Sequence, residues 1–199
     1  MRFITINLFN FEELTKEGQA RAIENERTRR IKAGESRPWE YEDNKSIEKI
    51  AGILGAEPFY RYDFDGFSTG KIEDEILELK DNRALAYIYK HYYPTKPKYI
   101  WKGNKHRQSK CTREFDGGYY MDYALVDAVE KFKAEIKAGR HPTIENYIEM
   151  VGDIIRQQIE ADEEYWDSDE GIKEDIMAHY DEPVFLINGD IFAHDVTPV

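Results

Sequence analysis

The stretch TIENYIEMVGDIIRQQIEADEE, residues 143–164, predicts a long amphipathic helix. Its apolar residues recur at helical spacing and share one face: Ile144, Tyr147, Ile148, Val151, Ile155 and Ile159. Such a face becomes stable only when other elements cover it.

Helical patterns recur along the rest of the chain. One helix is predicted from Thr15, a good N-cap, to about Ile31, and Gly34 lies just beyond it. Other helices are predicted at 46–54, 84–93, 123–137 and 168–176, with Ser168 as the last N-cap. Residues 72–79 fit either a short helix or a strand.

Strand patterns occur near both ends of the chain and in its middle. Residues 2–9, 59–64 and 99–101 are predicted strands. Asn188-Gly189 between apolar runs in 184–192 predicts a hairpin with a type I′ turn. The expected fold class is α+β, with several helices packed on one small antiparallel sheet. That sheet would combine the N-terminal strand, the central strand and the C-terminal hairpin.

The composition is that of a globular protein. The 199 residues, 41% hydrophobic and 14% aromatic, are expected to form a single domain at 1–199, with residues 90–113 as a basic flap. Cys111 is the one cysteine, so an internal disulfide is excluded and a reducing cytoplasm is expected. The start of the chain does not read as a signal peptide, and no apolar run has the length of a membrane span. We expect a cytoplasmic protein without a membrane partner.

The charge is distributed unevenly. Residues 90–113 hold eight Lys and Arg residues and no carboxylate, in a chain of formal net charge −12. From Asp122 to Val199 there are twenty carboxylates against six Lys or Arg residues. We therefore expect an electrically two-faced molecule, a property that bears on partners and association rates.

The basic stretch has two interpretations. Its cations could neutralise phosphates while Tyr92, Tyr93, Tyr99 and Trp101 stack on unpaired bases. The residues of this candidate nucleic-acid site are Lys96, Lys98, Tyr99, Trp101, Lys102, Lys105 and Arg107. Alternatively, the aromatic residues belong to the core and the lysines pair with the acidic half of the chain.

The acidic half suggests the opposite kind of partner. Helix carboxylates could imitate a ladder of phosphates and occupy a DNA- or RNA-binding groove of another protein, although a solvated helix face also explains them. The candidate contact residues are Glu145, Glu149, Asp153, Glu160, Asp162, Glu163 and Glu164.

Evidence for catalysis is weak. Residues 66–70 fit the G-x-S-x-G nucleophile elbow, with Ser68 as the nucleophile and Asp190 and His194 as candidate partners. The chain lacks the repeated strand–helix units of a doubly wound sheet, so a turn explains the pattern better. The five histidines show no metal-binding spacing, and the Asp63–Asp65 and Asp167–Asp169 pairs lack the rest of a calcium loop. We expect no catalytic residue, cofactor or metal.

Three segments resemble a family of phage and prophage proteins, some of them labelled antitoxin-like. The segments are Phe9–Glu24, Ile50–Ser68, and Asp169–Tyr180 together with Asn188–Phe192. Members of that family continue the Gly66-Phe67-Ser68 segment into a longer glycine- and aspartate-rich loop, whereas Lys71-Ile72-Glu73 follows here. The resemblance implies a phage origin and a compact α+β fold, and it transfers no catalytic residue.

The leading hypothesis is a non-enzymatic phage accessory protein that binds and inhibits a host protein. By analogy with other small acidic phage proteins, it would be an anti-defence inhibitor of the anti-CRISPR type, acting in the cytoplasm of the bacterial host. The alternative is a module that binds single-stranded nucleic acid through residues 90–113. The two hypotheses differ in whether the isolated protein binds an oligonucleotide.

Overall fold

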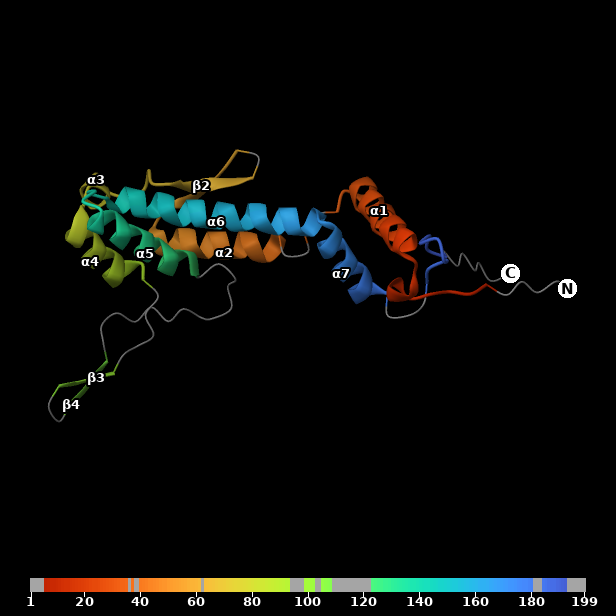
Figure 1. The fold of residues 1–199 in the computed structure, drawn as a ribbon. Coiled ribbons are helices and arrows are strands. Elements are labelled where there is room, and N and C mark those ends of the chain that lie inside the picture. The colour runs from red at the N-terminus through yellow and green to blue at the C-terminus, as the bar shows by residue number, and fades with distance from the viewer. Residues whose placement is uncertain are drawn as a thin grey trace, which may run out of the picture. The chain divides into compact units, whose positions relative to one another are not determined.

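The chain folds into two compact units (Figure 1). One unit consists of residues 1–37 and 161–199, and the other of residues 38–160. The computed structural model describes residues 6–35, 37, 40–61, 63–93, 123–180 and 184–192, together with the backbone of 99–102 and 105–108. The expectation of a single domain stays a prediction.

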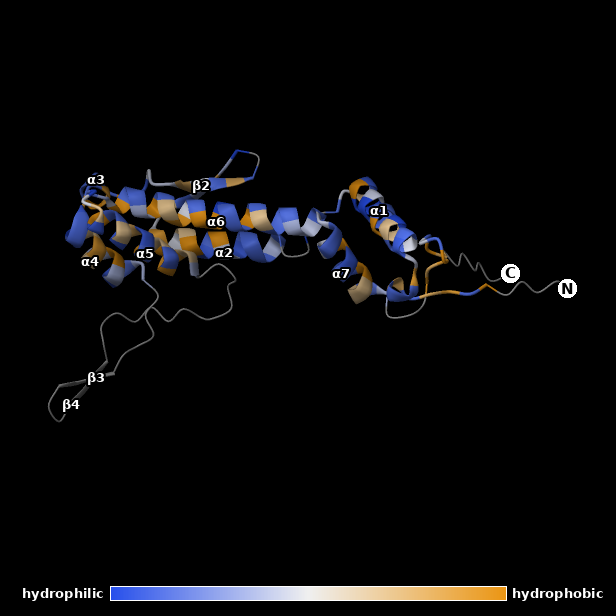
Figure 2. Cartoon of the chain, viewed as in Figure 1, coloured by the Kyte–Doolittle hydropathy of each residue, from blue (hydrophilic) through white to orange (hydrophobic). Residues whose placement is uncertain are grey.

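Four helices build the core of the 38–160 unit. They are α2 (Glu40–Leu54), α4 (Asp81–His91), α5 (Tyr123–Lys137) and α6 (Ile144–Asp167), whose last seven residues belong to the other unit. All six residues of the predicted apolar face of α6 are buried, Tyr147 and Ile155 completely. Hydrophobic positions recur among hydrophilic ones along these helices (Figure 2). The prediction of an amphipathic helix at 143–164 with one buried apolar face is confirmed.

The central strand prediction is wrong in its boundaries. Residues 59–64 are not one strand, because β1 (Glu57–Tyr60) ends and the chain turns before β2 (Phe64–Ser68) begins. The two strands pair antiparallel, with Phe59 opposite Gly66 and a register shift after Phe59. Asp63 lies in this turn, where a charged side chain stays hydrated. Asp residues are uncommon in strands for that reason.

Shorter elements complete the 38–160 unit. The ambiguous segment 72–79 contains a one-turn helix, α3 (Asp74–Leu77). The predicted strand at 99–101 is confirmed as β3 (Tyr99–Lys102), and it pairs with β4 (Lys105–Gln108).

Helices α1 (Lys16–Ala33) and α7 (Asp169–His179) form the framework of the other unit, preceded by the 3-10 turn η1 (Phe11–Glu13). The predicted N-caps are confirmed, since Thr15 accepts a hydrogen bond from the Gly18 N–H and Ser168 accepts one from the Gly171 N–H. Gly34 ends α1 in the left-handed conformation that the sequence suggests. A small separate core lies between these elements: Phe11, Leu14, Ala22, Ile172, Ile176 and Phe185.

The α+β class is confirmed, and the predicted arrangement of the strands is matched only in part. Among the described residues, the central strands β1 and β2 pair with each other alone, within residues 38–160. Near the chain ends, the described residues show isolated antiparallel bridges that join Phe9 to Phe185 and Phe185 to Ile191. Residues 2–5 of the predicted N-terminal strand lie outside the described part. The periodicity of a strand identifies its buried face but not the strand with which it pairs. For this reason the sequence did not predict which strands pair.

The C-terminal hairpin exists, but its predicted turn type is wrong. A type I′ turn needs positive φ at both Asn188 and Gly189, and only Gly189 has it, at 85°. The Gly189 N–H bonds to Leu186 O, and the Leu186 N–H bonds to Asp190 O, which gives a three-residue loop with glycine at the left-handed position. This loop lies directly against α1, where a Cβ on Gly189 would overlap the carbonyl oxygen of Gly18.

Across the described helices, none is both long and apolar enough to cross a membrane.

We predict that Gly189→Ala destabilises the unit formed by the two chain ends by about 2–4 kcal/mol. Alanine would adopt a strained φ and would also push the loop away from α1. Chemical denaturation measures the change. Gly34→Ala is the matched control, because Gly34 has φ 62° but open space around it, so only the backbone strain of about 1 kcal/mol applies. Equal effects of the two substitutions would contradict the close packing of the loop.

Candidate functional site

Four carboxylates of the candidate acidic site lie in one row along α6. Glu145, Glu149, Asp153 and Glu160 are all exposed. At 100° per residue they lie within about 80° around the helix axis, and the first three follow one another at a rise of about 6 Å. We call these four residues the acidic row. The helix itself positions them, because the opposite face of α6 is fixed in the core.

The acidic row is only weakly neutralised. Asp153 pairs with Arg156 at 2.6 Å, and Glu149 accepts a hydrogen bond from Asn146 at 3.1 Å. Within the part of the chain that the structure describes, no Lys or Arg side chain pairs with Glu145, Glu149 or Glu160. Adjacent like charges repel one another. A cation that approaches these carboxylates therefore lowers their electrostatic energy.

The other three candidate carboxylates lie in the last turns of α6, which belong to the 1–37/161–199 unit. Glu163 is exposed and pairs with Arg37 at 3.5 Å. Asp162 is half-buried and its helical position falls on a different side from the acidic row. Glu164 is exposed and follows Glu160 by one turn. The seven predicted residues thus separate into a row of four and three residues with different surroundings.

The β1–β2 hairpin packs beside the acidic row. Gly152 of α6 permits this approach, since a Cβ there would lie 3.3 Å from the Cα atom of Gly66. Arg156 fixes the contact: its Nη1 atom donates to the carbonyl oxygen of Asp65 at 3.3 Å and lies 3.7 Å from the Asp65 carboxylate. Arg156 therefore serves the fold as a bridge, and its charge does not cancel the whole row.

The hairpin exposes two aromatic side chains that the sequence analysis did not identify as site residues. Phe59 is 46% exposed and Tyr60 47% exposed. Phe59 lies opposite Gly66, which offers no side chain to cover the ring. Partial burial, with the negative charge of Glu48 adding to it, raises the pKa of the Tyr60 hydroxyl. The exposure of Phe59 follows from its pairing with Gly66. This pairing can be identified only once the register of β1 and β2 is known.

The candidate nucleic-acid residues fall largely outside the described side chains. Tyr99, Trp101, Lys102, Lys105 and Arg107 lie on β3 and β4, of which the backbone alone is described, and Lys96 and Lys98 lie outside the described residues. Tyr92 is 5% exposed and stacks against Tyr147 with ring centroids 5.9 Å apart. The expectation that Tyr92 stacks on a base is therefore wrong, because its ring belongs to the core. Tyr93 is half-buried and packs edge-on against Tyr89.

The Gly66–Gly70 pattern lies in a different context from a nucleophile elbow. Ser68 is the last residue of β2, in an antiparallel pair, and its strand leads into a turn instead of directly into a helix. An elbow requires a sharp strand-to-helix turn. Asp190 is engaged elsewhere, with Arg21 at 3.0 Å and Asn25 at 3.1 Å. His194 lies outside the described residues. Gly66 of this pattern is explained by the hairpin and its packing on α6 at Gly152.

Among the described residues there is no cluster of His, Cys, Asp or Glu that could hold a metal ion. One carboxylate of each calcium-like pair has an arginine partner: Asp65 lies 3.7 Å from Arg61 and from Arg156, and Asp169 pairs with Arg27 at 2.6 Å. These aspartates contribute to ion pairs.

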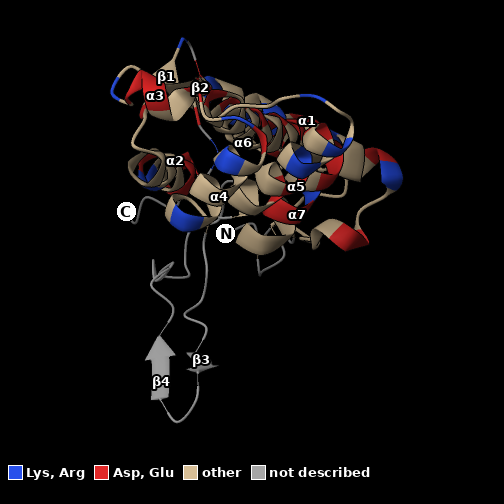
Figure 3. Ribbon diagram, turned by 90° about the vertical axis from the view of Figure 1, so that its left-hand side faces the viewer, with Lys and Arg blue, Asp and Glu red and all other residues tan. Residues whose placement is uncertain are grey.

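Acidic and basic residues are interspersed over the described helices (Figure 3). Ion pairs of α1 include contacts to α7, such as Arg27–Asp169 and Arg30–Asp175. Arg30, 5% exposed, pairs with Asp175 at 2.5 Å, donates to Trp166 O at 2.9 Å and stacks over the Trp166 ring at 3.5 Å. The buried carboxylate of Glu26 pairs with Arg29 at 2.7 Å. Among the described helices, charge segregation is thus local, as in the acidic row.

We predict that Arg30→Met lowers the free energy of unfolding by about 3–5 kcal/mol, because Asp175 then loses a buried partner. The control is Arg27→Met on the same helix, whose partners Glu24 and Asp169 are largely exposed. Its effect should stay below about 1 kcal/mol. If urea titrations gave the same decrease in the free energy of unfolding for both variants, the Arg30–Asp175 pair would stabilise the fold no more than an exposed pair.

We predict acid sensitivity from Glu26. The hydrogen bond from Arg29 lowers the pKa of Glu26 below its ordinary value of 4.5, against the opposing effect of burial. A lowered folded-state pKa stabilises the fold above the unfolded-state value, and this contribution is lost as the pH falls through the folded-state pKa. Stability should therefore decline below about pH 4.5, and Glu26→Gln should flatten that decline while reducing stability at pH 7. Unfolding curves recorded between pH 7 and 3 measure both effects. If the free energy of unfolding of Glu26→Gln falls with pH as steeply as that of the wild type, Glu26 is not the cause of the acid sensitivity.

Comparison of the chain with family models, with curated proteins and with solved structures found no match. The resemblance to the phage family therefore stays a prediction.

Proposed function

We propose that this protein is a non-enzymatic phage accessory protein that binds and inhibits a host protein through the acidic row. Its partner would be a nucleic-acid-binding component of a host defence system, of the kind that anti-CRISPR inhibitors block. The observation that carries the proposal is the row itself: four exposed carboxylates on one side of α6, three of them without a described cation partner. The phage origin rests on the resemblance.

The physical basis is charge complementarity. A groove that binds nucleic acid is lined by Lys and Arg residues that neutralise phosphates. A rigid helix that presents carboxylates one turn apart offers such a groove a comparable ladder of negative charge. The formal net charge of −12 would speed the encounter with a basic surface at low salt.

Exposed aromatic residues beside the row would supply affinity that charge alone does not. Binding energy at protein interfaces concentrates in a few buried aromatic or Arg anchors, while charged contacts at the rim contribute mainly to the association rate. Phe59 and Tyr60 are exposed on the hairpin that packs on α6 at Gly152. The proposed surface therefore consists of the acidic row and these two rings, and it acts in the host cytoplasm.

We predict that the combined change Glu145→Gln, Glu149→Gln and Glu160→Gln weakens partner binding roughly tenfold to a hundredfold. None of the three carboxylates has a Lys or Arg partner among the described residues, so the fold should keep its stability. The measurement is affinity capture from nuclease-treated host lysate with the wild-type protein, followed by titration of the purified partner with both proteins.

The matched control replaces three other exposed carboxylates of the same unit by glutamine: Glu73, Glu75 and Glu78. It removes the same charge and should leave the affinity within about twofold of wild type. If the control and the row variant weaken binding equally, the affinity depends on the net charge of the protein and not on the position of the acidic row. Capture of no host protein, or of nucleic acid alone, would contradict the proposal.

We also predict that Phe59→Ser reduces the affinity for the same partner at least tenfold by raising the dissociation rate. The aromatic ring of Phe59 already faces solvent in the free protein, so folding should change little. Surface plasmon resonance separates the rates, and Tyr41→Ser, which changes a 67% exposed ring on α2, is the control. If the interface were purely electrostatic, Phe59→Ser would have the same dissociation rate as the wild-type protein.

A further inference from the structure

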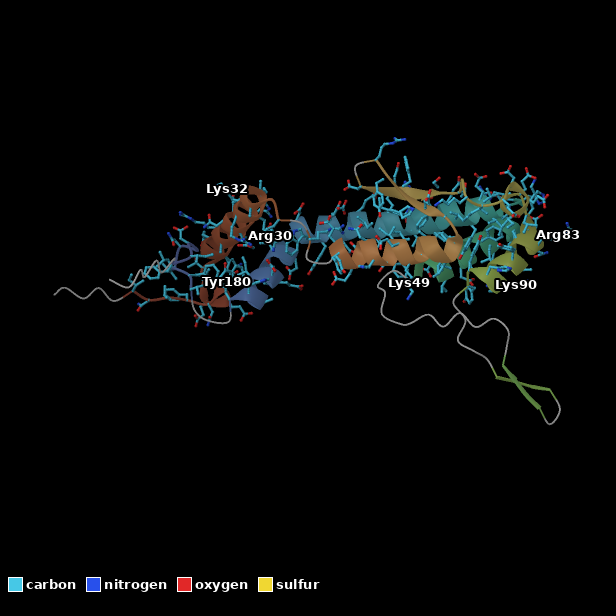
Figure 4. The ribbon with its side chains drawn as sticks, turned by 180° about the vertical axis from the view of Figure 1, so that it is seen from behind. Arg30, Lys32, Lys49, Arg83, Lys90 and Tyr180 are labelled. Carbon is cyan, nitrogen blue, oxygen red and sulfur yellow. The ribbon has the colours of Figure 1, made fainter. Side chains whose placement is uncertain are left out.

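The outward side of α4 has the opposite character from the acidic row. Arg83, Tyr87, Lys90 and His91 lie within about 100° around the helix axis. Arg83 and Lys90 are exposed, and Figure 4 shows both side chains projecting outward from α4. Ala84 and Ile88 are fully buried and fix the orientation of the helix on the core. Tyr87 and His91 are half-buried, and we call the four residues together the α4 face.

Carboxylates are scarce on this face. The single acidic residue of α4, Asp81, is engaged by His141, whose Nδ1 atom lies 3.0 Å from its carboxylate. No ion pair joins Arg83 or Lys90 to a carboxylate of the described residues. Glu75 and Glu78 do line the same open hollow as Arg83. They oppose an anion at that end, so the Lys90 end is the stronger position for a phosphate.

The aromatic rings of the α4 face are held rigidly. Tyr87 and His91 stack with ring centroids 4.2 Å apart and an interplanar angle of 29°. Tyr87 also packs edge-on against Tyr92 at 5.4 Å, and Tyr92 stacks on the buried Tyr147. A ring that the core already fixes loses little conformational freedom when a ligand stacks on it. This is the property of an aromatic platform for an unpaired base.

We propose that the α4 face binds single-stranded nucleic acid, with a base joining the Tyr87–His91 stack and Lys90 and Arg83 contacting the flanking phosphates. A duplex keeps its bases stacked inside, so it could use the two cations but not the rings. The inference concerns a different surface from the acidic row, and it adds oligonucleotide binding by the isolated protein, which the inhibitor hypothesis by itself does not predict.

The charge contribution is tested with the double variant Arg83→Gln, Lys90→Gln and the control Lys16→Gln, Lys32→Gln. The control removes two exposed cations of α1, which also have no ion pair among the described residues. Fluorescence anisotropy with a labelled oligo(dT) of about twelve nucleotides gives the affinity at several salt concentrations. We expect roughly a tenfold loss and a salt slope reduced by about 0.7 per missing cation for the double variant, and wild-type behaviour for the control.

The stacking contribution is tested with His91→Ala and with an abasic oligonucleotide of the same length. We expect wild-type protein to prefer oligo(dT) over the abasic strand about tenfold, and His91→Ala to lose that preference. Three results would overturn the inference: no binding by wild-type protein at about 50 mM salt, wild-type affinity in the Arg83/Lys90 double variant, or equal binding of oligo(dT) and the abasic strand. A circular dichroism spectrum of each variant confirms that it has folded.

Discussion

The burial of one face of α6 is the constraint on which the 38–160 unit depends. Tyr147, Val151 and Ile155 are completely removed from water, and the Tyr147 hydroxyl donates to the carbonyl oxygen of Leu125 at 2.9 Å. Loss of that packing would remove the shared core of α2, α4 and α5. Because the helix cannot rotate without exposing these residues, its opposite side stays in solvent with a fixed set of carboxylates. The same packing thus produces both the stability of the unit and the proposed binding surface.

The unit formed by the two chain ends depends on a different kind of contact. Its apolar core is small, and much of the interface between α1 and α7 consists of buried or half-buried ion pairs around Arg30. Close backbone packing between Gly18 and the Gly189 loop adds to this. Two of the three segments that resemble the phage family, Phe9–Glu24 and 169–192, lie in this unit. The third, Ile50–Ser68, lies in the 38–160 unit, and none of the three segments includes the acidic row.

Local features could be predicted well from the sequence. The periodicity of α6, the N-caps Thr15 and Ser168, and the end of α1 at Gly34 depend on residues within a few positions of one another. The pairing of strands could not be predicted, since it depends on contacts between distant segments. Helical spacing placed Glu145, Glu149 and Glu160 together, but the burial of Tyr92 and the exposure of Phe59 follow from tertiary packing. The turn at Asn188-Gly189 differs because the loop adapts to Gly18 of α1.

The central claim is that the exposed side of α6 occupies a site made for nucleic acid on another protein. The most direct measurement is competition: the purified partner, loaded with its own nucleic acid, is titrated with this protein while bound nucleic acid is monitored by anisotropy. The account predicts that nucleic acid is displaced in proportion to the protein bound, and that displacement weakens as salt rises. A stable ternary complex, in which partner, nucleic acid and protein remain together, would contradict it.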